Sequence, residues 1–166
     1  AGNELTVRIN RMLSRKEEYI GANPLTGLPG RVSFDREANK RITEKVPLSI
    51  FYIDIDNFKA FNDYYGYQKG DDIIRFVARI IREAVDSIGG KNDLVGHIGG
   101  DDFLVLTEPV RALELCSCIT QKFDRQIRNY YNSADIERNF ITVTDRRNYL
   151  RNFPIMTLSV ASVSRE

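Results

Sequence analysis

The sequence has no tryptophan, a single histidine and only two cysteines among its 166 residues. Cys116 and Cys118 lie two positions apart in a segment with helical spacing, so they point to different sides of the helix and we expect free thiols. Two cysteines and one histidine are also too few ligands for a structural zinc site. These shortages exclude a disulfide scaffold and a zinc module, and reduced thiols favour a cytoplasmic protein.

An excess of one charge and a long apolar run are absent as well. The 24 Lys and Arg residues balance 23 Asp and Glu, which leaves a net charge of +1 and no overall field that would recruit nucleic acid or a bilayer. No stretch approaches the ~20 apolar residues of a membrane helix, and the N-terminus lacks the pattern of a signal peptide. With 42% hydrophobic residues, we expect one compact soluble domain that holds any anionic ligand locally.

The first residues have the spacing of an amphipathic helix. Residues 3–20 contain Leu5, Ile9, Met12 and Tyr19 in steps of four, three and seven, the spacing of one helix face. Such a helix either folds back onto its own domain or forms a short coiled coil that joins an upstream sensor. We therefore divide the chain into a linker or signalling helix, residues 1–22, and a domain, residues 23–166, which opens with a loop rich in proline and glycine at 23–31.

Two short apolar runs, 95–98 and 103–106, are joined by Gly-Gly-Asp-Asp at positions 99–102. Glycine tolerates the backbone angles of a tight turn, so this pattern predicts a β-hairpin with Asp101 and Asp102 at its tip. Neighbouring strand residues face opposite sides, so both carboxylates face the same way only where the turn redirects one of them. A hydrophilic turn without function is the alternative reading of these four residues alone.

A second acidic strand end lies upstream, where the apolar run from Leu48 finishes in Asp54-Ile55-Asp56. If this strand pairs beside the hairpin, Asp54 and a turn aspartate meet at one edge of the sheet. Carboxylate oxygens are the ligands that Mg²⁺ and Mn²⁺ prefer. The pattern therefore predicts a site for a divalent cation.

A polar segment follows this strand and precedes an apolar helical stripe over residues 73–85. In it, Asn62 and Asp71 flank a glycine-containing loop. An amide and a carboxylate together supply the donors and acceptors that read the edge of a guanine base. Asp71 is equally suited to an N-cap of the helix that follows.

The remainder of the chain predicts one more helix and a late hairpin. The helix covers residues 109–131 with a stripe of Leu113, Leu115, Ile119, Phe123 and Ile127. A strand at 139–144, a turn at 145–148 and a long strand at 149–163 complete the expected structure.

Five segments, in this order, resemble the motifs of the GGDEF family of diguanylate cyclase domains. They are Asn23 to Arg31, Asp54 to Lys59, Asn62 to Asp71, Gly99 to Phe103, and Thr157 to Ala161. The resemblance implies an α+β fold with a central, mostly antiparallel sheet flanked by helices, similar to the palm of polymerases and to adenylyl cyclase. It also implies bacterial second-messenger signalling, in which two facing domains each hold one GTP and condense the pair to cyclic di-GMP.

The resemblance also implies roles for individual residues. Asp54, Asp101 and the Ile55 carbonyl would hold Mg²⁺ or Mn²⁺, and Asp101, Asp102 and Lys59 would form the catalytic set. The nucleotide would be bound by Asn57, Phe58, Lys59, Asn62 and Asp71, the first three at the phosphates and the last two at guanine.

The chain departs from the family pattern at several positions. Asp102 stands where the family usually has Glu, Tyr67 where it has His, and His97 where it has Arg; we expect His97 to support the hairpin rather than act as a base. The family's product-inhibition site is an Arg-x-x-Asp; here it is Gly90-Lys91-Asn92-Asp93, without the Arg. A family helix carrying a Lys and an Arg is also expected after residue 161, and the sequence ends before it.

These departures leave two functions open. One is a diguanylate cyclase that works as a homodimer. The other is a weakly active or inactive GTP-binding module that regulates an attached or partner domain, such as a cyclic di-GMP phosphodiesterase.

Overall fold

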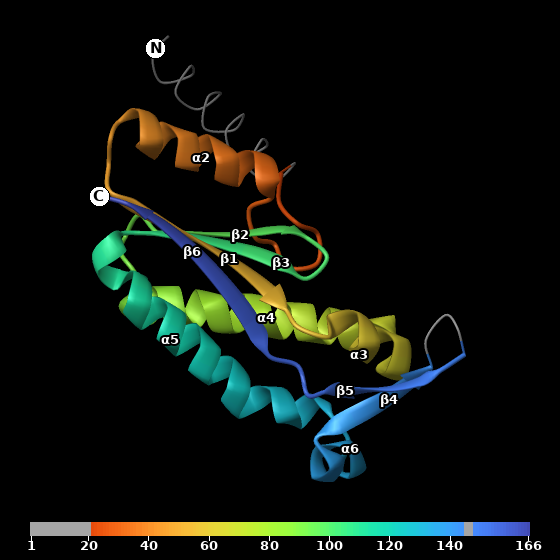
Figure 1. The fold of residues 1–166 in the computed structure, drawn as a ribbon. Coiled ribbons are helices and arrows are strands. Elements are labelled where there is room, and N and C mark those ends of the chain that lie inside the picture. Colours follow the sequence, from red (N-terminus) through yellow and green to blue (C-terminus); the bar gives the residue numbers. More distant parts are fainter. Residues whose placement is uncertain (1–20, 145–147) are drawn as a thin grey trace, which may run out of the picture.

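A computed structural model describes residues 21–144 and 148–166 (Figure 1). The expected N-terminal helix over residues 3–20 lies outside the described residues, and so does most of the turn at 145–148. The main sheet is antiparallel, with the strand order β2-β3-β1-β6. Its strands are β1 (Leu48–Ile55), β2 (Leu94–Gly99), β3 (Asp102–Thr107) and β6 (Leu158–Arg165).

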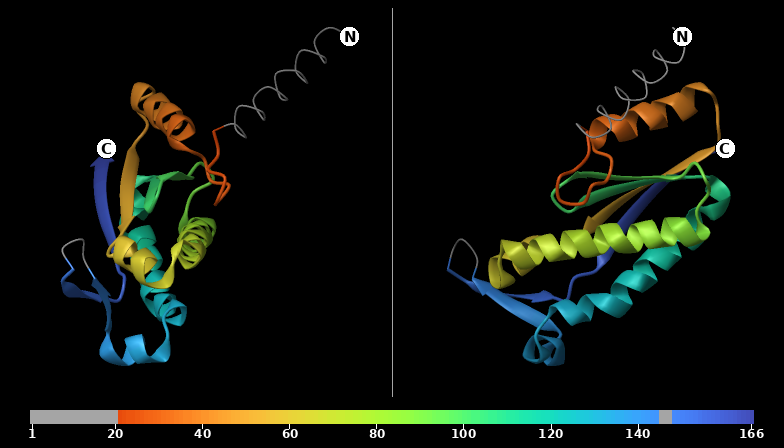
Figure 2. Two further views of the ribbon diagram at one scale, coloured as in Figure 1. Left: turned by 90° about the vertical axis from the view of Figure 1, so that its right-hand side faces the viewer. Right: turned by 180° about the vertical axis from the view of Figure 1, so that it is seen from behind.

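Helices cover both faces of this sheet (Figures 1 and 2). One face packs against α4 (Tyr67–Ile88) and α5 (Pro109–Gln126), and the other against α2 (Arg31–Thr43). Strand alternation divides the core accordingly, because Phe51 and Ile53 face α4 and α5 whereas Leu48 joins Phe34 of α2. The architecture confirms the α+β fold class and the antiparallel sheet flanked by helices.

The segment after β1 is more helical than its sequence predicts. Helix α3 (Phe58–Tyr65) and helix α4 are separated by Gly66 alone, whose φ of 89° lies in the region that favours glycine. The prediction of a loop between Asn62 and Asp71 is therefore wrong, since Gly66 alone turns the chain between the two helices. The N-cap reading of Asp71 is also wrong, because α4 begins at Tyr67 and Gly66 occupies its N-cap.

The C-terminal third also differs from its sequence-based prediction. Helix α5 ends at Gln126 and is followed by a 3-10 turn (Ile127–Tyr130) and the short helix α6 (Ser133–Arg138). Leu113 is 81% exposed and does not belong to the packed stripe, whereas Leu115, Ile119 and Phe123 are fully buried. The expected long strand is divided: β4 (Phe140–Thr144) pairs with β5 (Leu150–Pro154), and β6 then joins the main sheet beside β1.

None of the helices within residues 21–144 and 148–166 combines the length and the apolar character that a membrane crossing requires. Cys116 and Cys118 are free thiols on α5, as predicted.

Close packing between α2 and β2 gives a first prediction. A Cβ on Gly96 would lie 2.8 Å from Cδ2 of Phe34, so Gly96→Ala should push α2 away from the sheet. We expect a loss of about 1–3 kcal/mol in the free energy of unfolding, measured with urea. Phe34→Leu in the same chain should restore part of this loss; strictly additive effects in the double mutant would contradict the proposed contact.

Candidate active site

The Gly-Gly-Asp-Asp segment forms the predicted hairpin turn between β2 and β3. Gly99 pairs with Asp102, and both glycines of the turn have positive φ, 140° at Gly99 and 55° at Gly100. Buried His97 supports the turn, because its Nε2 lies 2.9 Å from the Gly100 carbonyl oxygen and its Nδ1 lies 3.1 Å from Thr26 Oγ1. The expectation that His97 supports the hairpin is thus confirmed.

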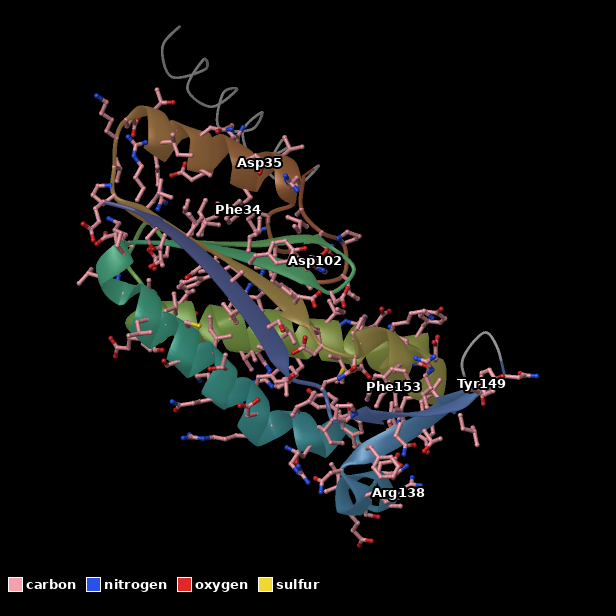
Figure 3. The ribbon with its side chains drawn as sticks, in the orientation of Figure 1. Phe34, Asp35, Asp102, Arg138, Tyr149 and Phe153 are labelled. Carbon is pink, nitrogen blue, oxygen red and sulfur yellow. The ribbon has the colours of Figure 1, made fainter. Side chains whose placement is uncertain are left out.

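Three carboxylates meet at this end of the sheet. Ile53 of β1 pairs with Phe103 of β3, which brings Asp54 beside the hairpin. One oxygen from each of Asp54, Asp101 and Asp102 lies within 4.8 Å of the others. Figure 3 marks Asp102 at this turn. The strand register shifts between His97 and Gly99, next to the turn. The sequence predicted that one turn aspartate would meet Asp54; in the structure both Asp101 and Asp102 do.

Mutual repulsion and burial change the acidity of this cluster. Partial burial raises the pKa of Asp54, and the charges of Asp101 and Asp102 raise it further. Burial also raises the pKa of Asp101, with a further contribution from Asp102. The interaction of the Tyr52 hydroxyl with the Asp102 carboxylate is the main reason that the pKa of Tyr52 rises to about 12. A compact set of carboxylate oxygens suits a hard divalent cation such as Mg²⁺ or Mn²⁺.

Tyr52 and Asp56 were not assigned roles from the sequence. Tyr52 lies two residues before Asp54, and the two-residue period of a strand places both side chains on one face. Asp56 does not join the acidic cluster, because it accepts hydrogen bonds from Thr157 Oγ1 at 2.6 Å and Ser159 Oγ at 2.7 Å. It therefore ties the end of β1 to the start of β6.

The start of α3 follows the acidic cluster directly. Asn57 has a left-handed backbone with φ of 64°, and the helix begins at Phe58. The first backbone N–H groups of a helix attract anions. Lys59 is exposed, and its Nζ lies 2.8 Å from Asp63 Oδ2 on the same helix. Asn57, Phe58 and Lys59 are the residues predicted to bind the phosphates, and the Lys59 side chain forms an ion pair with Asp63.

The Asn62 side chain lies in the narrow space between α3 and α4. A Cβ on Gly70 would lie 1.7 Å from Asn62 Oδ1, so a larger residue there would displace the Asn62 side chain. Asn62 Oδ1 is buried and has no hydrogen-bond donor within the described part of the chain. Such an atom is costly to bury unless a donor, such as an N–H of a ligand, reaches it. Asp71 is the residue after Gly70 and is exposed.

The segment that resembles the product-inhibition site is committed to internal contacts. Asp93 Oδ2 accepts hydrogen bonds from the Gly90 N–H at 3.0 Å and from Thr107 Oγ1 at 2.7 Å. The Arg41 guanidinium donates to the Asn92 carbonyl oxygen. The segment borders a cleft of about 780 Å³ beside α2. Asp93 therefore stabilises its own turn.

Comparison with known proteins agrees with this geometry. The family described as "Diguanylate cyclase, GGDEF domain" matches residues 22–144. A diguanylate cyclase of Vibrio cholerae is 34% identical over 96 residues, which are 56% of this chain and 27% of that protein. Diguanylate cyclase DosC of Escherichia coli is 39% identical over 101 residues, or 58% of this chain and 21% of its own length. Cyclic di-GMP phosphodiesterase PdeB of Shewanella oneidensis is 28% identical over 68% of this chain and 12% of its own.

Solved structures share the fold. Diguanylate cyclase SiaD of Pseudomonas aeruginosa, solved with its activator SiaC, superposes with a TM-score of 0.67 at 20% identity, over 99% of this chain and 57% of that one. The GGDEF domain of DgcB from Caulobacter crescentus, in complex with c-di-GMP, gives a TM-score of 0.58 at 21% identity over 88% and 78%. The antiparallel sheet flanked by helices is thus the fold of GGDEF domains. The family match over residues 22–144 shows that the chain belongs to the GGDEF family of diguanylate cyclase domains.

The raised pKa values of Asp54 and Asp101 give a second prediction. The carboxyl groups of Asp54 and Asp101 bind their protons more tightly in the folded protein than in the unfolded chain. Protonation of these two groups therefore stabilises the fold fully below their ordinary pKa, and this stabilisation is lost as pH rises through their pKa in the folded protein. At pH 7 without metal, Asp54→Asn should therefore raise the melting temperature by about 2–4 °C, the shift that roughly 1 kcal/mol produces in a chain of this size.

Thermal melts with and without MgCl₂ or MnCl₂ would measure this effect. The wild-type melting temperature should rise with the cation and that of Asp54→Asn should not. Asp56→Asn is the matched control on the same strand end, and it should lower the melting temperature because it weakens two hydrogen bonds. A lower melting temperature for Asp54→Asn in metal-free buffer would contradict the repulsion.

Proposed function

We propose that this domain binds GTP with a divalent cation and, facing a second domain of the same kind, condenses two GTP molecules to cyclic di-GMP. The observation that carries the proposal is the cluster of Asp54, Asp101 and Asp102 at the start of α3. Family membership and relatives named diguanylate cyclases support it.

The proposed roles of the individual residues are as follows. Asp54, Asp101 and the Ile55 carbonyl would hold Mg²⁺ or Mn²⁺; when bound, the cation would neutralise phosphate charge and acidify the attacking hydroxyl. The backbone N–H groups of Asn57 and Phe58 and the Lys59 ammonium would bind the phosphates. Asp101 would accept the proton of the 3′-hydroxyl, with Asp102 completing the acidic site.

The guanine base would lie at the junction of α3 and α4. The free acceptor Asn62 Oδ1 suits an N–H of the base, and the exposed Asp71 carboxylate offers a second acceptor. One domain binds one GTP in this scheme. Two domains must therefore face each other, so a homodimer is the catalytic unit and proximity controls the rate.

A second candidate function is a GTP-binding module that controls another domain. Asp102 in place of Glu shortens the carboxylate side chain by one methylene, and a displacement of about 1 Å can lower a rate about a hundredfold. The chain spans 27% of the Vibrio cholerae relative and 12% of the phosphodiesterase PdeB, which leaves room for an upstream sensor or a downstream phosphodiesterase in a parent protein. A cytoplasmic location fits either function.

The third prediction tests turnover in the full-length parent protein. With GTP and Mg²⁺, the wild type should form cyclic di-GMP, and Asp101→Ala should lower the rate by at least about a hundredfold while the fold is retained. Chromatography of the products and circular dichroism measure the two quantities. Continued synthesis by Asp101→Ala would remove the catalytic assignment. GTP binding without product, followed by turnover in Asp102→Glu, would favour the regulatory module.

The fourth prediction tests base recognition. Asp71→Ala should weaken GTP binding about tenfold and leave ATP binding unchanged, because guanine presents an N1–H and a 2-amino donor to this carboxylate whereas adenine has an acceptor N1 and no 2-amino group. Asp72→Ala is the matched control, since Asp72 is the neighbouring exposed acid on α4 and pairs with Arg75 at 3.0 Å. Calorimetric titration of both nucleotides gives the ratio of their affinities. An equal loss of affinity for GTP and ATP would contradict the proposed role of Asp71 in recognising guanine.

A further inference from the structure

A buried carboxylate lies at the far end of α3 from the acidic cluster, in a segment to which the sequence assigns no function. Asp135 of α6 has no exposed surface. Its oxygens accept hydrogen bonds from the Tyr65 hydroxyl and the Arg138 guanidinium, and a longer one of 3.4 Å from the Tyr64 hydroxyl. A buried charge of this kind is tolerated only where its partners are held in place, so the bonds constrain the elements that supply them.

Two of these partners are the last residues of α3. Tyr65 is held twice, because its hydroxyl donates to Asp135 and accepts from the Asn132 N–H at 3.1 Å. Its ring contacts Phe61 at 4.7 Å and Tyr131 at 5.6 Å between centroids, and Lys69 Nζ lies 4.4 Å from its centroid. Tyr65 therefore fastens α3 to the segment before α6 and to the start of α4.

The same segment connects α3 to the rest of the domain. The Tyr131 hydroxyl accepts from the Met156 N–H at 3.0 Å, just before β6. Strand β4 lies alongside α3, as Figure 1 shows, and Figure 3 shows Arg138 on α6 at the base of the β4–β5 hairpin. Residues 131–144 and 148–156 thus form a brace beside α3, and the hydrogen bond between Tyr131 and Met156 connects it to the start of β6.

Helix α3 needs such a brace because it is short and is joined to α4 by a single residue. It has eight residues and is followed by Gly66 alone. Isolated helices of this length are marginal in water. Asn62 lies one turn before Tyr65, and its unpartnered Oδ1 lies against Gly70 of α4, so its position depends on how α3 and α4 are placed relative to each other.

We propose that Asp135 is a positioning residue: through Tyr65 it fixes α3 and thereby places the Asn62 carboxamide to read the base of the bound nucleotide. This inference rests on the proposed function, because it assigns Asp135 to the guanine end of that site. It predicts that base selectivity depends on a carboxylate that never touches the nucleotide.

The fifth prediction compares Asp135→Asn and Tyr65→Phe with the wild type by calorimetric titration of GTP and ATP in the presence of Mn²⁺. Each variant should lower the ratio of GTP to ATP affinity about tenfold, the effect of one misplaced hydrogen bond, while ATP affinity stays unchanged. Tyr65→Phe keeps the ring contacts, which protects the fold if Asp135→Asn is unstable. Glu137→Gln is the matched control, an exposed acid on the same helix, and it should leave the ratio unchanged.

The outcomes separate this inference from the proposed function. An equal loss of affinity for GTP and ATP would show that Asp135 has a purely structural role, and it would contradict the proposal that Asp135 positions Asn62. An unchanged ratio in a folded Tyr65→Phe variant would overturn it as well. A wild type that does not prefer GTP to ATP would overturn the proposed function and this inference with it. Tyr64→Phe should have a smaller effect than Tyr65→Phe, because its bond to Asp135 is long.

Discussion

The antiparallel pairing of β1 with β3 is the contact on which the site depends. Ile53 lies opposite Phe103, and both side chains are fully buried against the α4 and α5 side of the sheet. A slip of one residue would expose these side chains and turn Asp54 toward the core. The hydrophobic core thus fixes the register that brings Asp54 to Asp101 and Asp102. Core packing and the acidic cluster are specified by the same set of alternating residues.

Local patterns were sufficient to predict this half of the site. Gly-Gly between two apolar runs predicts a hairpin, and an apolar strand that ends in Asp54 predicts an acidic sheet edge. The approach of both turn aspartates to Asp54 was not predictable, because it depends on the irregular register beside His97. The interaction between Tyr52 and Asp102 follows from strand periodicity, but only once β1 and β3 are known to be neighbours.

The proposed guanine-binding half of the site was harder to predict because its geometry is set by contacts distant in sequence. Asn62 and Asp71 were identified, but a glycine-containing loop was expected where Gly66 alone joins two helices. No periodicity reveals that Gly70 is the residue that admits the Asn62 side chain. Likewise, Asp135 is seventy residues from Tyr65, and short-range patterns carry no information about such a pair. Helix α6 is too short for periodicity to be read.

The two ends of α3 consequently depend on different kinds of interaction. At its start, Asn57 follows the end of β1, so the register of the main sheet holds this end beside carboxylates whose repulsion costs stability. At its end, a buried carboxylate is fully hydrogen bonded to Tyr65 and Arg138 and adds directional constraint. In the proposed function, the end that binds the metal has to tolerate repulsion until a cation arrives, whereas the end that reads the base has to be rigid before the base arrives. The short helix between them can satisfy both demands because each end is anchored to a different part of the fold.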